Sequence, residues 1–410
     1  GPVLIDIAKN AQFGMLDFEY RKCIRMRSYA PEPRLSLDNL KAAAAAINAA
    51  KKPYILAGQG IILGNAEREF REFVEKAGIP VAWTLLGACA LPREHPLNVG
   101  MLGMHGNYST NIKTNECDVL IGVGMRFDDR VTGDVKRYAK QAKIIHLEID
   151  KAEINKVVHA DIPLHGDVKD LLPVLTKLIE KRSHEDWINE FKAIDKIEEE
   201  KVIRHDLNPT KPGLTMGEVI NIINRKTGGD AIAVTDVGQH QMIASRYLNF
   251  KNKRSFITSG GLGTMGFGLP AAHGAKIGAP DKQVILFVGD GGLQMTIQEM
   301  GTINQTQAAV KIVLLNNKYL GMVRQWQQLF FEKRYSETYL LNPDFIKVAE
   351  GFGIKGKKVI ERPQLDAAIE EMLEFNGPYL LEVSIEKEDN VFPMVPTGAS
   401  VSEVILEPKK

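Results

Sequence analysis

Short apolar runs rich in β-branched residues alternate along most of the chain with longer stretches whose apolar residues recur at helical spacing. In the first half, the longer stretches predict helices at 37–50 and 65–76, and the short runs predict strands at 53–57, 80–84, 119–123 and 143–148. In the second half, the short runs predict strands at 231–235, 255–258, 284–288, 312–315 and 379–385. Such alternation is typical of parallel sheets covered by helices on both faces. The pattern therefore predicts an α/β protein with two doubly wound parallel-sheet domains.

Polar and charged segments divide the chain. Residues 12–36 are polar and carry prolines, and residues 181–213 are charged, so both are predicted to be linkers, the second with one or two surface helices. The two α/β domains are then 37–180 and 214–395, followed by a C-terminal tail at 396–410. Ahead of the first linker, residues 2–7 have the composition of a buried strand that begins abruptly. We therefore expect residues 1–11 to be the end of a domain that precedes this chain.

Composition and charge narrow the class of protein. The 410 residues are 44% hydrophobic and 25% charged with a net charge of +1, which is ordinary for a globular protein and gives no electrostatic signature of nucleic-acid or anionic-membrane binding. The longest apolar runs are strand-sized, and no signal segment opens the sequence. Cys23, Cys89 and Cys117 lack metal-ligand spacing, so we expect free, buried thiols and a cytoplasmic protein.

Polar residues follow two neighbouring strands of the predicted second sheet. Gly289-Asp290-Gly291 comes directly after the strand at 284–288, Asn316-Asn317 comes directly after the strand at 312–315, and a helix is predicted between them at 293–305. A strand-helix-strand unit of this kind is parallel and right-handed, so both strand ends lie at the ligand-binding edge of the sheet. Asp290 and Asn317 are therefore expected to meet there.

The chemistry of this edge suits a divalent metal that holds a diphosphate. The Asp290 carboxylate, the Asn317 amide oxygen and the backbone carbonyl of Tyr319 are hard oxygen ligands of the kind that Mg²⁺ prefers, and they leave positions for phosphate oxygens and water. The backbone N–H groups of Gly291 and Gly292 would face the same anion. Gly289-Asp290-Gly291 alone is better explained as an ordinary turn, and Asn316-Asn317 alone as a helix cap. The spacing between the two motifs favours the metal-diphosphate site.

Several further motifs are spread over nearly the whole chain. They stand at 101–106 (Met-Leu-Gly-Met-His-Gly), 126–133, 238–242, 259–270 and 321–326 (Gly-Met-Val-Arg-Gln-Trp). Together with the Gly-Asp-Gly and Asn-Asn pair, they make the chain resemble the thiamine-diphosphate enzymes. More narrowly, the chain is similar to the FAD-containing catalytic subunits of the acetolactate (acetohydroxyacid) synthases.

In the C-terminal domain, the resemblance implies a pocket for thiamine diphosphate with Mg²⁺. Met265 would bend the cofactor into a V, and the Gly263 carbonyl would hold its amino group. Gln239 and His240 would contact the diphosphate end, and Trp326 would form the wall of the second-substrate pocket. The remaining cofactor contacts expected here are Gly289, Gly321 and Met322. Without the resemblance, close packing explains the glycine-rich turn, and a cap or core position explains His240 and Trp326.

In the first domain, the resemblance implies segments that wrap an extended FAD. Arg126 and Arg130 would contact its phosphates or the flavin edge, and Glu148 would accept ribose hydroxyls. The turn Gly58-Gln59-Gly60 lacks the full dinucleotide-binding pattern, and residues 126–130 also fit a solvated charged loop. The other flavin contacts expected are Gly60, Thr84, Leu85, Gly103, Met104, His105, Gly106, Gly124, Asp128, Ile149 and Asp167. The 126–130 loop favours the biosynthetic type, whose flavin would be structural.

The implied reaction decarboxylates pyruvate and joins the remaining unit to a second 2-ketoacid, pyruvate or 2-ketobutyrate. The product would be 2-acetolactate or 2-aceto-2-hydroxybutyrate, for branched-chain amino acid biosynthesis. In the family, the cofactor is activated by a glutamate on a pyrimidine-binding domain, of which residues 1–11 match the last strand. No carboxylate in this chain takes that role by motif, so the polypeptide is expected to be inactive alone.

The same resemblance implies a homodimer or homotetramer, because in the family the cofactor bridges two subunits, and a small regulatory subunit. Two other interpretations of the function remain. One is a different thiamine-diphosphate enzyme, such as a pyruvate oxidase, a glyoxylate carboligase or a sulfoacetaldehyde-processing enzyme, against which Trp326 and the 126–130 loop weigh. The other is a non-catalytic FAD-binding module, which would need neither Asp290 nor Asn317.

Overall fold

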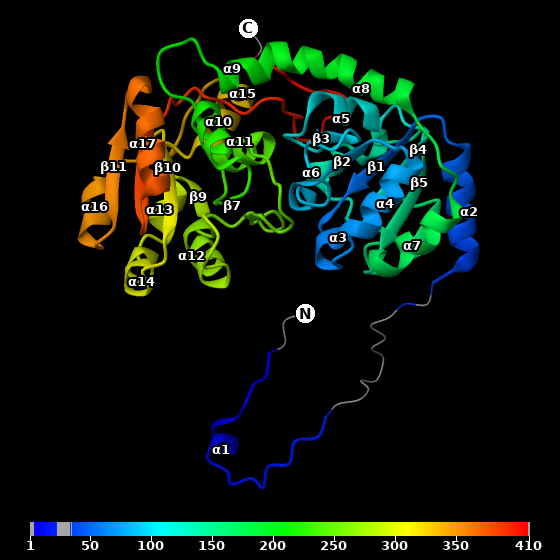
Figure 1. The fold of residues 1–410 in the computed structure, drawn as a ribbon, viewed down its shortest axis with the longest axis horizontal. Helices are drawn as coiled ribbons and strands as arrows, with labels where there is room; N and C mark the ends of the chain where they lie inside the picture. The colour runs from blue at the N-terminus through cyan, green and yellow to red at the C-terminus, as the bar shows by residue number, and fades with distance from the viewer. Residues whose placement is uncertain (1–3, 23–32, 34, 409–410) are drawn as a thin grey trace. The chain divides into compact units, whose positions relative to one another are not determined.

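The computed structural model describes residues 4–22, 33 and 35–408, and the chain divides into two compact units, Gly1–Pro33 and Arg34–Lys410. The first unit contains one short helix, α1 (Lys9–Gln12), in its described part (Figure 1). Residues 4–7 are irregular, and Leu4 is 89% exposed. The described residues of the strand predicted at 2–7 form no strand in this unit, because none of them pairs with a neighbouring strand, and the prediction that residues 1–11 end a preceding domain stays a prediction. Cys23 lies outside the described residues.

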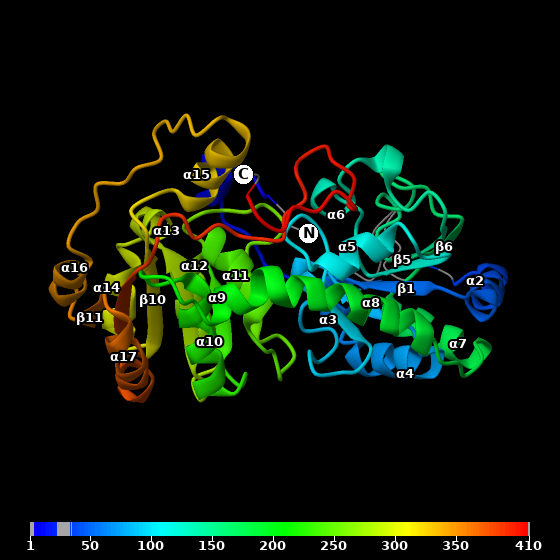
Figure 2. The same cartoon turned by 90° about the horizontal axis from the view of Figure 1, so that it is seen from above.

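The second unit contains two six-stranded sheets, each built from parallel strands. The first has the order β3 (Asn98–Met101), β2 (Val81–Trp83), β1 (Pro53–Ala57), β4 (Val119–Val123), β5 (Lys143–Glu148), β6 (Ile162–His165). Its helices are α2 (Leu37–Ala49), α3 (Gln59–Leu63), α4 (Glu67–Ala77), α5 (Tyr108–Thr114), α6 (Asp129–Thr132) and α7 (Val168–Leu178). Figure 2 shows α4 and α7 on one side of this sheet and α5 and α6 on the other.

The second sheet has the order β11 (Lys355–Val359), β12 (Tyr379–Ser384), β10 (Val310–Asn316), β9 (Val284–Gly289), β7 (Ile232–Thr235), β8 (Phe256–Thr258). Its helices are α10 (Met216–Thr227), α11 (Gln239–Tyr247), α12 (Gly268–Gly278), α13 (Asp290–Met295), α14 (Glu299–Thr306), α15 (Gly321–Phe330), α16 (Phe345–Gly351) and α17 (Arg362–Glu374). Two doubly wound parallel-sheet domains, as predicted, are confirmed.

Burial on both faces explains why the central strands read as continuous apolar runs. Along β10, Val313 and Leu315 pack with residues of α10, α11 and α17, whereas Ile312 and Leu314 pack with residues of α12, α14 and α16. Every residue of β10 is buried. A strand covered by helices on both sides has no polar face to show, so its sequence lacks the alternation of a half-exposed strand.

The nine strands predicted within the two α/β domains are all present, and the three that were missed, β3, β6 and β11, lie at sheet edges. β6 carries Pro163, and β11 carries Gly356 and three lysines. Edge strands are less buried and tolerate such residues, so they lack the apolar run that identifies a central strand. The helix predicted at 293–305 was wrong in its bounds, because two shorter helices, α13 and α14, replace it.

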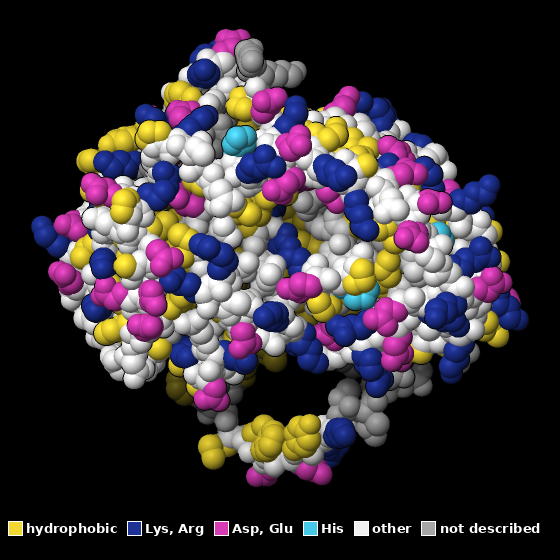
Figure 3. Space-filling view, turned by 45° about the horizontal axis from the view of Figure 1, so that its top comes forward, with side chains coloured by type: hydrophobic (Ala, Val, Ile, Leu, Met, Phe, Trp, Pro, Cys, Tyr) yellow, Lys and Arg dark blue, Asp and Glu magenta, His cyan; other side chains and the backbone are white. Residues whose placement is uncertain are grey.

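The charged linker forms α8 (Glu185–Glu198), a π-helical turn (Glu199–Ile203) and α9 (Arg204–Leu207). Glu198 at the end of α8 is fully enclosed, which the surface helix predicted here does not explain. Basic and acidic side chains are interspersed over the face in Figure 3, in keeping with the net charge of +1. None of the helices in the described residues is long and apolar enough to cross a membrane.

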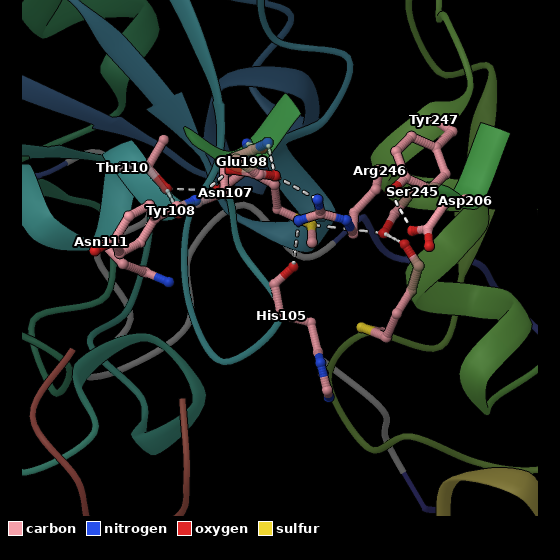
Figure 4. Close-up of polar contacts among 12 residues, drawn as sticks. His105, Asn107, Tyr108, Thr110, Asn111, Glu198, Asp206, Ser245, Arg246 and Tyr247 are labelled. Atoms are coloured by element: carbon pink, nitrogen blue, oxygen red, sulfur yellow. Dashed lines mark hydrogen bonds and ion pairs between the residues drawn. The ribbon is translucent and has the colours of Figure 1, made fainter. Parts of the chain in front are cut away.

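Glu198 forms a buried ion pair with Arg246 of α11, and each side chain is 1% exposed (Figure 4). The Glu198 carboxylate also accepts hydrogen bonds from Asn107 Nδ2 at 2.9 Å and from the Tyr108 backbone N–H at 2.5 Å. Arg246 Nη1 donates to the His105 carbonyl at 3.2 Å. One ion pair therefore joins the linker helix, the second sheet's helix α11 and the loop that precedes α5.

We predict that Arg246→Met destabilises the protein by about 3 kcal/mol, because it leaves the Glu198 carboxylate buried without its counter-charge. The double variant Arg246→Met with Glu198→Gln removes the stranded charge and keeps an oxygen acceptor for Tyr108. It should recover about half of the lost free energy of unfolding, measured by urea denaturation. A single variant that costs less than about 1 kcal/mol would show that the pair contributes little.

Candidate cofactor site

The predicted acid and amide lie at the ends of adjacent strands. In the register of β9 and β10, Gly289 is opposite Leu315, so Asp290 and Asn317 follow at the same edge of the sheet. Both residues are buried, at 1% and 8% exposure. Asp290 begins α13, which places the N–H groups of Gly291 and Gly292 in the first turn of that helix. The two strand ends therefore lie at one edge of the sheet, as the spacing predicted.

Asn342, which the sequence analysis missed, connects the two strand ends. Its Nδ2 donates to Asp290 Oδ2 at 2.6 Å and to Asn316 Oδ1 at 3.1 Å. Gln294 Nε2 of α13 donates to Asn342 Oδ1 at 2.9 Å. The bridge between Tyr319 and Tyr339 brings the segment of Asn342 to this edge. No motif marks this residue, because its position depends on a loop that returns to the sheet.

Four glycines of the predicted site lie close to neighbouring side chains. A Cβ on Gly321 would lie 2.1 Å from Gln239 Oε1 and 2.8 Å from Asn317 Nδ2. On Gly291 it would lie 2.7 Å from a methyl of Leu320, and on Gly289 it would lie 3.2 Å from the His240 ring. A Cβ on Gly292 would meet the Asp236 carboxylate at 2.4 Å. These side chains pack tightly at the strand ends.

Gln239 and His240 begin α11 and face the same edge. Gln239 is 3% exposed, and its Oε1 is 3.5 Å from Asn317 Nδ2. Burial lowers the pKa of His240 to about 4, so its ring is neutral at physiological pH. His240 Nε2 is buried and has no hydrogen-bond partner among the described residues. A buried polar atom without a partner fits a site that a ligand completes.

Asp236, also missed from the sequence, fixes the glycine-rich turn. Its carboxylate accepts hydrogen bonds from the backbone N–H groups of Val237, Gly266 and Gly268 at 2.8, 3.2 and 2.8 Å. The turn brings Met265 beside Gly291, where its Cε is 3.6 Å from the position of a Cβ on that glycine. Gly263, with φ of +63°, is exposed and has open space around it. The buried acid therefore positions the loop that carries Met265.

Burial raises the pKa of Asp290 to about 6, and the hydrogen bond from Asn342 opposes this effect. A carboxylate that is costly to ionise in the ligand-free protein is suited to receive a cation. The described residues contain no cluster of three or more His, Cys, Asp or Glu side chains that could hold a metal. A cation here would therefore depend on amide and carbonyl oxygens as well, such as Asn317 Oδ1 and the Tyr319 carbonyl.

Trp326 and Met322 lie on α15. Trp326 is half-buried and contacts Phe330, with ring centroids 4.9 Å apart. It also packs against Phe392 and Met394 of the segment that follows the second sheet. Met322 packs against the core beside α10 and α11. The predicted role of Trp326 as the wall of a substrate pocket stays a prediction.

The glycines expected to bind FAD pack against one another. A Cβ on Gly58 would lie 2.2 Å from the Gly124 carbonyl oxygen, and one on Gly60 would lie 2.7 Å from the Gly124 Cα. Gly124 itself has φ of +57°. The turns after β1 and β4 therefore cross in direct backbone contact, which explains these glycines by packing. Thr84 and Leu85 follow β2, and the Thr84 N–H donates to the Ala57 carbonyl at 2.9 Å.

The predicted loop 103–106 is held by hydrogen bonds from the first domain and from residues that follow it in the chain. Asn111 makes hydrogen bonds of 3.0 and 2.9 Å to the N–H and carbonyl of Gly103. The Met104 N–H donates to the Arg130 carbonyl, and its own carbonyl accepts from Val395 N–H, both at 2.8 Å. Burial lowers the pKa of His105 to about 4. A Cβ on Gly106 would clash with the Leu102 backbone.

The polar residues expected around FAD differ in exposure. Arg126 and Arg130 are half or more exposed, with side chains at 51% and 65%, whereas burial raises the pKa of Glu148. Ile149 is 50% exposed. Asp128 and Asp167 act as helix N-caps, of α6 and α7. The two arginines are therefore available to a ligand, whereas Glu148 is buried at the end of β5 and the two aspartates have a structural role.

A small hollow of about 50 Å³ lies where the first domain meets the C-terminal segment. It is lined by Gly103, Met104, Asp129, Arg130, Gly133, Val395, Pro396, Thr397, Gly398 and Val401. The segment is anchored there by Arg137 with Glu403 and by Asn115 with Ser400 and Ser402. The residues predicted to form a tail are therefore packed on the first domain.

Two family models match the chain. The thiamine pyrophosphate enzyme central domain matches residues 40–175, and the thiamine pyrophosphate enzyme C-terminal TPP binding domain matches residues 236–383. The chain is 42% identical over 408 residues to the acetolactate synthase isozyme 2 large subunit of Escherichia coli K12, covering 99% of this chain and 72% of the relative. The chain belongs to the acetolactate synthase large-subunit family.

Other relatives support the same assignment. The acetolactate synthase large subunit of Lactococcus lactis is 42% identical over 407 residues, covering 99% of this chain and 70% of the relative. A probable acetolactate synthase large subunit of Methanocaldococcus jannaschii is 40% identical over 423 residues, covering all of this chain and 71% of the relative. The two α/β domains are therefore those of a thiamine-diphosphate enzyme of this family.

Asp389 introduces a pH dependence close to the site. Its carbonyl accepts from Gln239 Nε2 at 3.2 Å, and its Oδ2 accepts from the Met216 N–H at 2.8 Å. Burial of the carboxyl group, with a smaller contribution from Asp206, raises the pKa of Asp389 to about 7. A raised acid pKa means that its stabilising contribution is full below the unfolded value of about 4 and is lost as the pH rises through about 7.

We expect Asp389→Asn to be more stable than the wild type by about 1–2 kcal/mol at pH 8, because the amide keeps the Met216 hydrogen bond without a buried charge. The difference should shrink steadily between pH 7 and pH 4. Urea denaturation of both proteins at several pH values measures it. A difference that is independent of pH would show that the carboxyl group titrates normally.

Proposed function

We propose that the chain binds thiamine diphosphate and Mg²⁺ at the carboxyl edge of the second sheet and provides this half of an acetolactate synthase active site. The observation that carries the proposal is the convergence of Asp290, Asn317, Gln239 and His240 at adjacent strand ends. Family membership supports the choice of cofactor. The reaction is decarboxylation of pyruvate and transfer to a second 2-ketoacid, giving 2-acetolactate or 2-aceto-2-hydroxybutyrate.

Asp290, Asn317 Oδ1 and the Tyr319 carbonyl hold the metal, which neutralises the diphosphate. The N–H groups of Gly291 and Gly292 at the start of α13 bind phosphate oxygens, since a helix N-terminus favours negative charge. His240 is neutral, so its Nε2 can donate a hydrogen bond to the same anion without an ionic contribution. When bound, the thiamine cofactor supplies the electron sink for decarboxylation.

Met265 and the Gly263 carbonyl would face the organic part of the cofactor and orient it. Support comes from the position of Met265 beside Gly291, next to the helix that would receive the diphosphate. Gly263 is exposed, and a Cβ on it would meet no other atom, which leaves space beside it for a ligand. Trp326, Gly321 and Met322 shape the adjoining wall on α15. Orientation of the cofactor is then the main contribution of these side chains.

FAD is proposed as a second, structural cofactor on the first domain. Arg126 and Arg130 are exposed and can meet phosphates, and Glu148 lies at the end of β5, where it can accept ribose hydroxyls. Gly58, Gly60 and Gly124 keep the strand ends close and unobstructed. We further propose a cytoplasmic homodimer or homotetramer with a small regulatory subunit, as the designation large subunit among its relatives suggests.

Thiamine diphosphate should bind the purified polypeptide only in the presence of Mg²⁺. Asp290→Asn is expected to weaken this binding at least 100-fold, because an amide cannot supply the anionic ligand. It should not lower the free energy of unfolding without ligand, since it removes a buried charge. Isothermal titration calorimetry with thiamine diphosphate, and separately with inorganic diphosphate, measures the affinity.

The matched control is Glu299→Gln, the same acid-to-amide change on α14, which should bind like the wild type. Binding of equal strength by Asp290→Asn, or binding that needs no divalent metal, would contradict the proposed site. Binding of inorganic diphosphate but not of the whole cofactor would limit the proposal to the anion anchor.

For the 410-residue polypeptide by itself, we expect no acetolactate from pyruvate, thiamine diphosphate, Mg²⁺ and FAD. The physical reason is that none of its carboxylates matches the glutamate that makes the cofactor's amino group basic. A colorimetric assay for acetolactate, with a full-length relative as positive control, measures this. Appreciable turnover would show that another group supplies the proton.

A further inference from the structure

Gln325 of α15 is fully buried, and its side-chain amide makes several hydrogen bonds. Its Oε1 accepts from Gln239 Nε2 at 2.9 Å and from the Val391 N–H at 2.9 Å. Its Nε2 donates to the Val391 carbonyl at 3.1 Å and lies 3.6 Å from Met394 Sδ. The pair of hydrogen bonds with the Val391 backbone fixes which end of the Gln325 amide is the oxygen, and therefore which end faces Gln239.

The orientation of the Gln239 amide follows from that of Gln325. Its Nε2 donates to two acceptors, Gln325 Oε1 and the Asp389 carbonyl at 3.2 Å, so its Oε1 is turned to Asn317 Nδ2. A flipped amide would place an oxygen against both acceptors and a nitrogen against Asn317. Gly321 leaves room for this arrangement, since a Cβ there would lie 2.1 Å from Gln239 Oε1.

The Asn317 amide is oriented in turn. Its Nδ2 faces Gln239, and its Oδ1 accepts from the Tyr319 N–H at 3.0 Å, which leaves the oxygen a second lone pair for a ligand. A chain of amides thus runs from the Val391 backbone through Gln325 and Gln239 to Asn317. None of its links is a charge, so its effect is to fix orientation.

We propose that Gln325 is a positioning residue for cofactor binding, which acts on the metal-diphosphate edge through Gln239 and Asn317 without touching the cofactor. This inference rests on the proposed function. The ligand concerned is a diphosphate held by a divalent metal. The inference predicts that the effects of Gln325 and Gln239 on the affinity for this ligand are not independent. A residue that only fills the core would change stability without this coupling.

The test compares Gln325→Met, Gln239→Met and the double variant with the wild type by titrating thiamine diphosphate at saturating Mg²⁺. Gln325→Met should weaken binding about tenfold, which corresponds to about 1.4 kcal/mol. The double variant should bind no more weakly than Gln239→Met alone, because the first residue acts through the second. Circular dichroism and urea denaturation establish that each variant is folded.

Gln328→Met is the matched control on the same helix. Gln328 Nε2 donates to Glu388 and its Oε1 accepts from Asn390, so it contacts the segment beside Val391, and none of its described hydrogen bonds involves Gln239. It should lower stability and leave the affinity unchanged. If Gln325→Met does not fold, Gln325→Asn, which is polar but too short to make both sets of contacts, provides the same comparison.

The outcomes separate the two proposals. Loss of affinity in Gln325→Met, with a fully non-additive double variant and an unaffected Gln328→Met, supports the inference. Wild-type affinity in Gln325→Met, or additive effects in the double variant, overturns the inference and leaves the cofactor site standing. A wild type that binds no thiamine diphosphate overturns the proposed function and this inference with it.

Discussion

Parallel pairing of β9 with β10 is the constraint on which the rest of the site depends. Because both strands run in the same direction and end together, the residue after each strand is delivered to one edge. Asp290 and Asn317 reach this edge by strand pairing, and loop contacts then orient them. Helices bury both faces of these strands. A shift of register would therefore expose apolar side chains and would also displace Asp290 and Asn317. Stability and chemistry are fixed by the same pairing.

The sequence predicted the central strands well because they are buried on both faces and so carry continuous apolar runs. It also predicted that Asp290 and Asn317 would meet, since their positions follow from strand ends and the handedness of the connection. The edge strands β3, β6 and β11 could not be found in this way, because proline, glycine and lysine interrupt them. Their places in the sheets depend on neighbours that are distant in sequence.

The residues whose roles the sequence did not reveal share one property. Asn342, Asp236 and Gln325 act on the site through hydrogen bonds to other residues, and their partners are fixed only by the tertiary fold. For several glycines, in contrast, the sequence predicted a ligand contact that packing alone can explain. Gly58, Gly60 and Gly124 were predicted as flavin contacts, yet their close approach is sufficient to explain them. A glycine shows that space is tight at a turn, and the shape of the turn decides whether backbone or ligand fills it.

Residues 388–405 pack on both domains: Gln325 and Gln328 hold Val391 and Glu388 beside the second sheet, and Arg137 and Asn115 hold Glu403 and Ser400 beside the first. These residues are made after the last strand of both sheets. During synthesis, therefore, the first sheet can form before this segment is made, but the orientation of the amides at the cofactor edge cannot be completed until the segment is present. Completion of the site is then a late event, separate in time from the folding of the first domain.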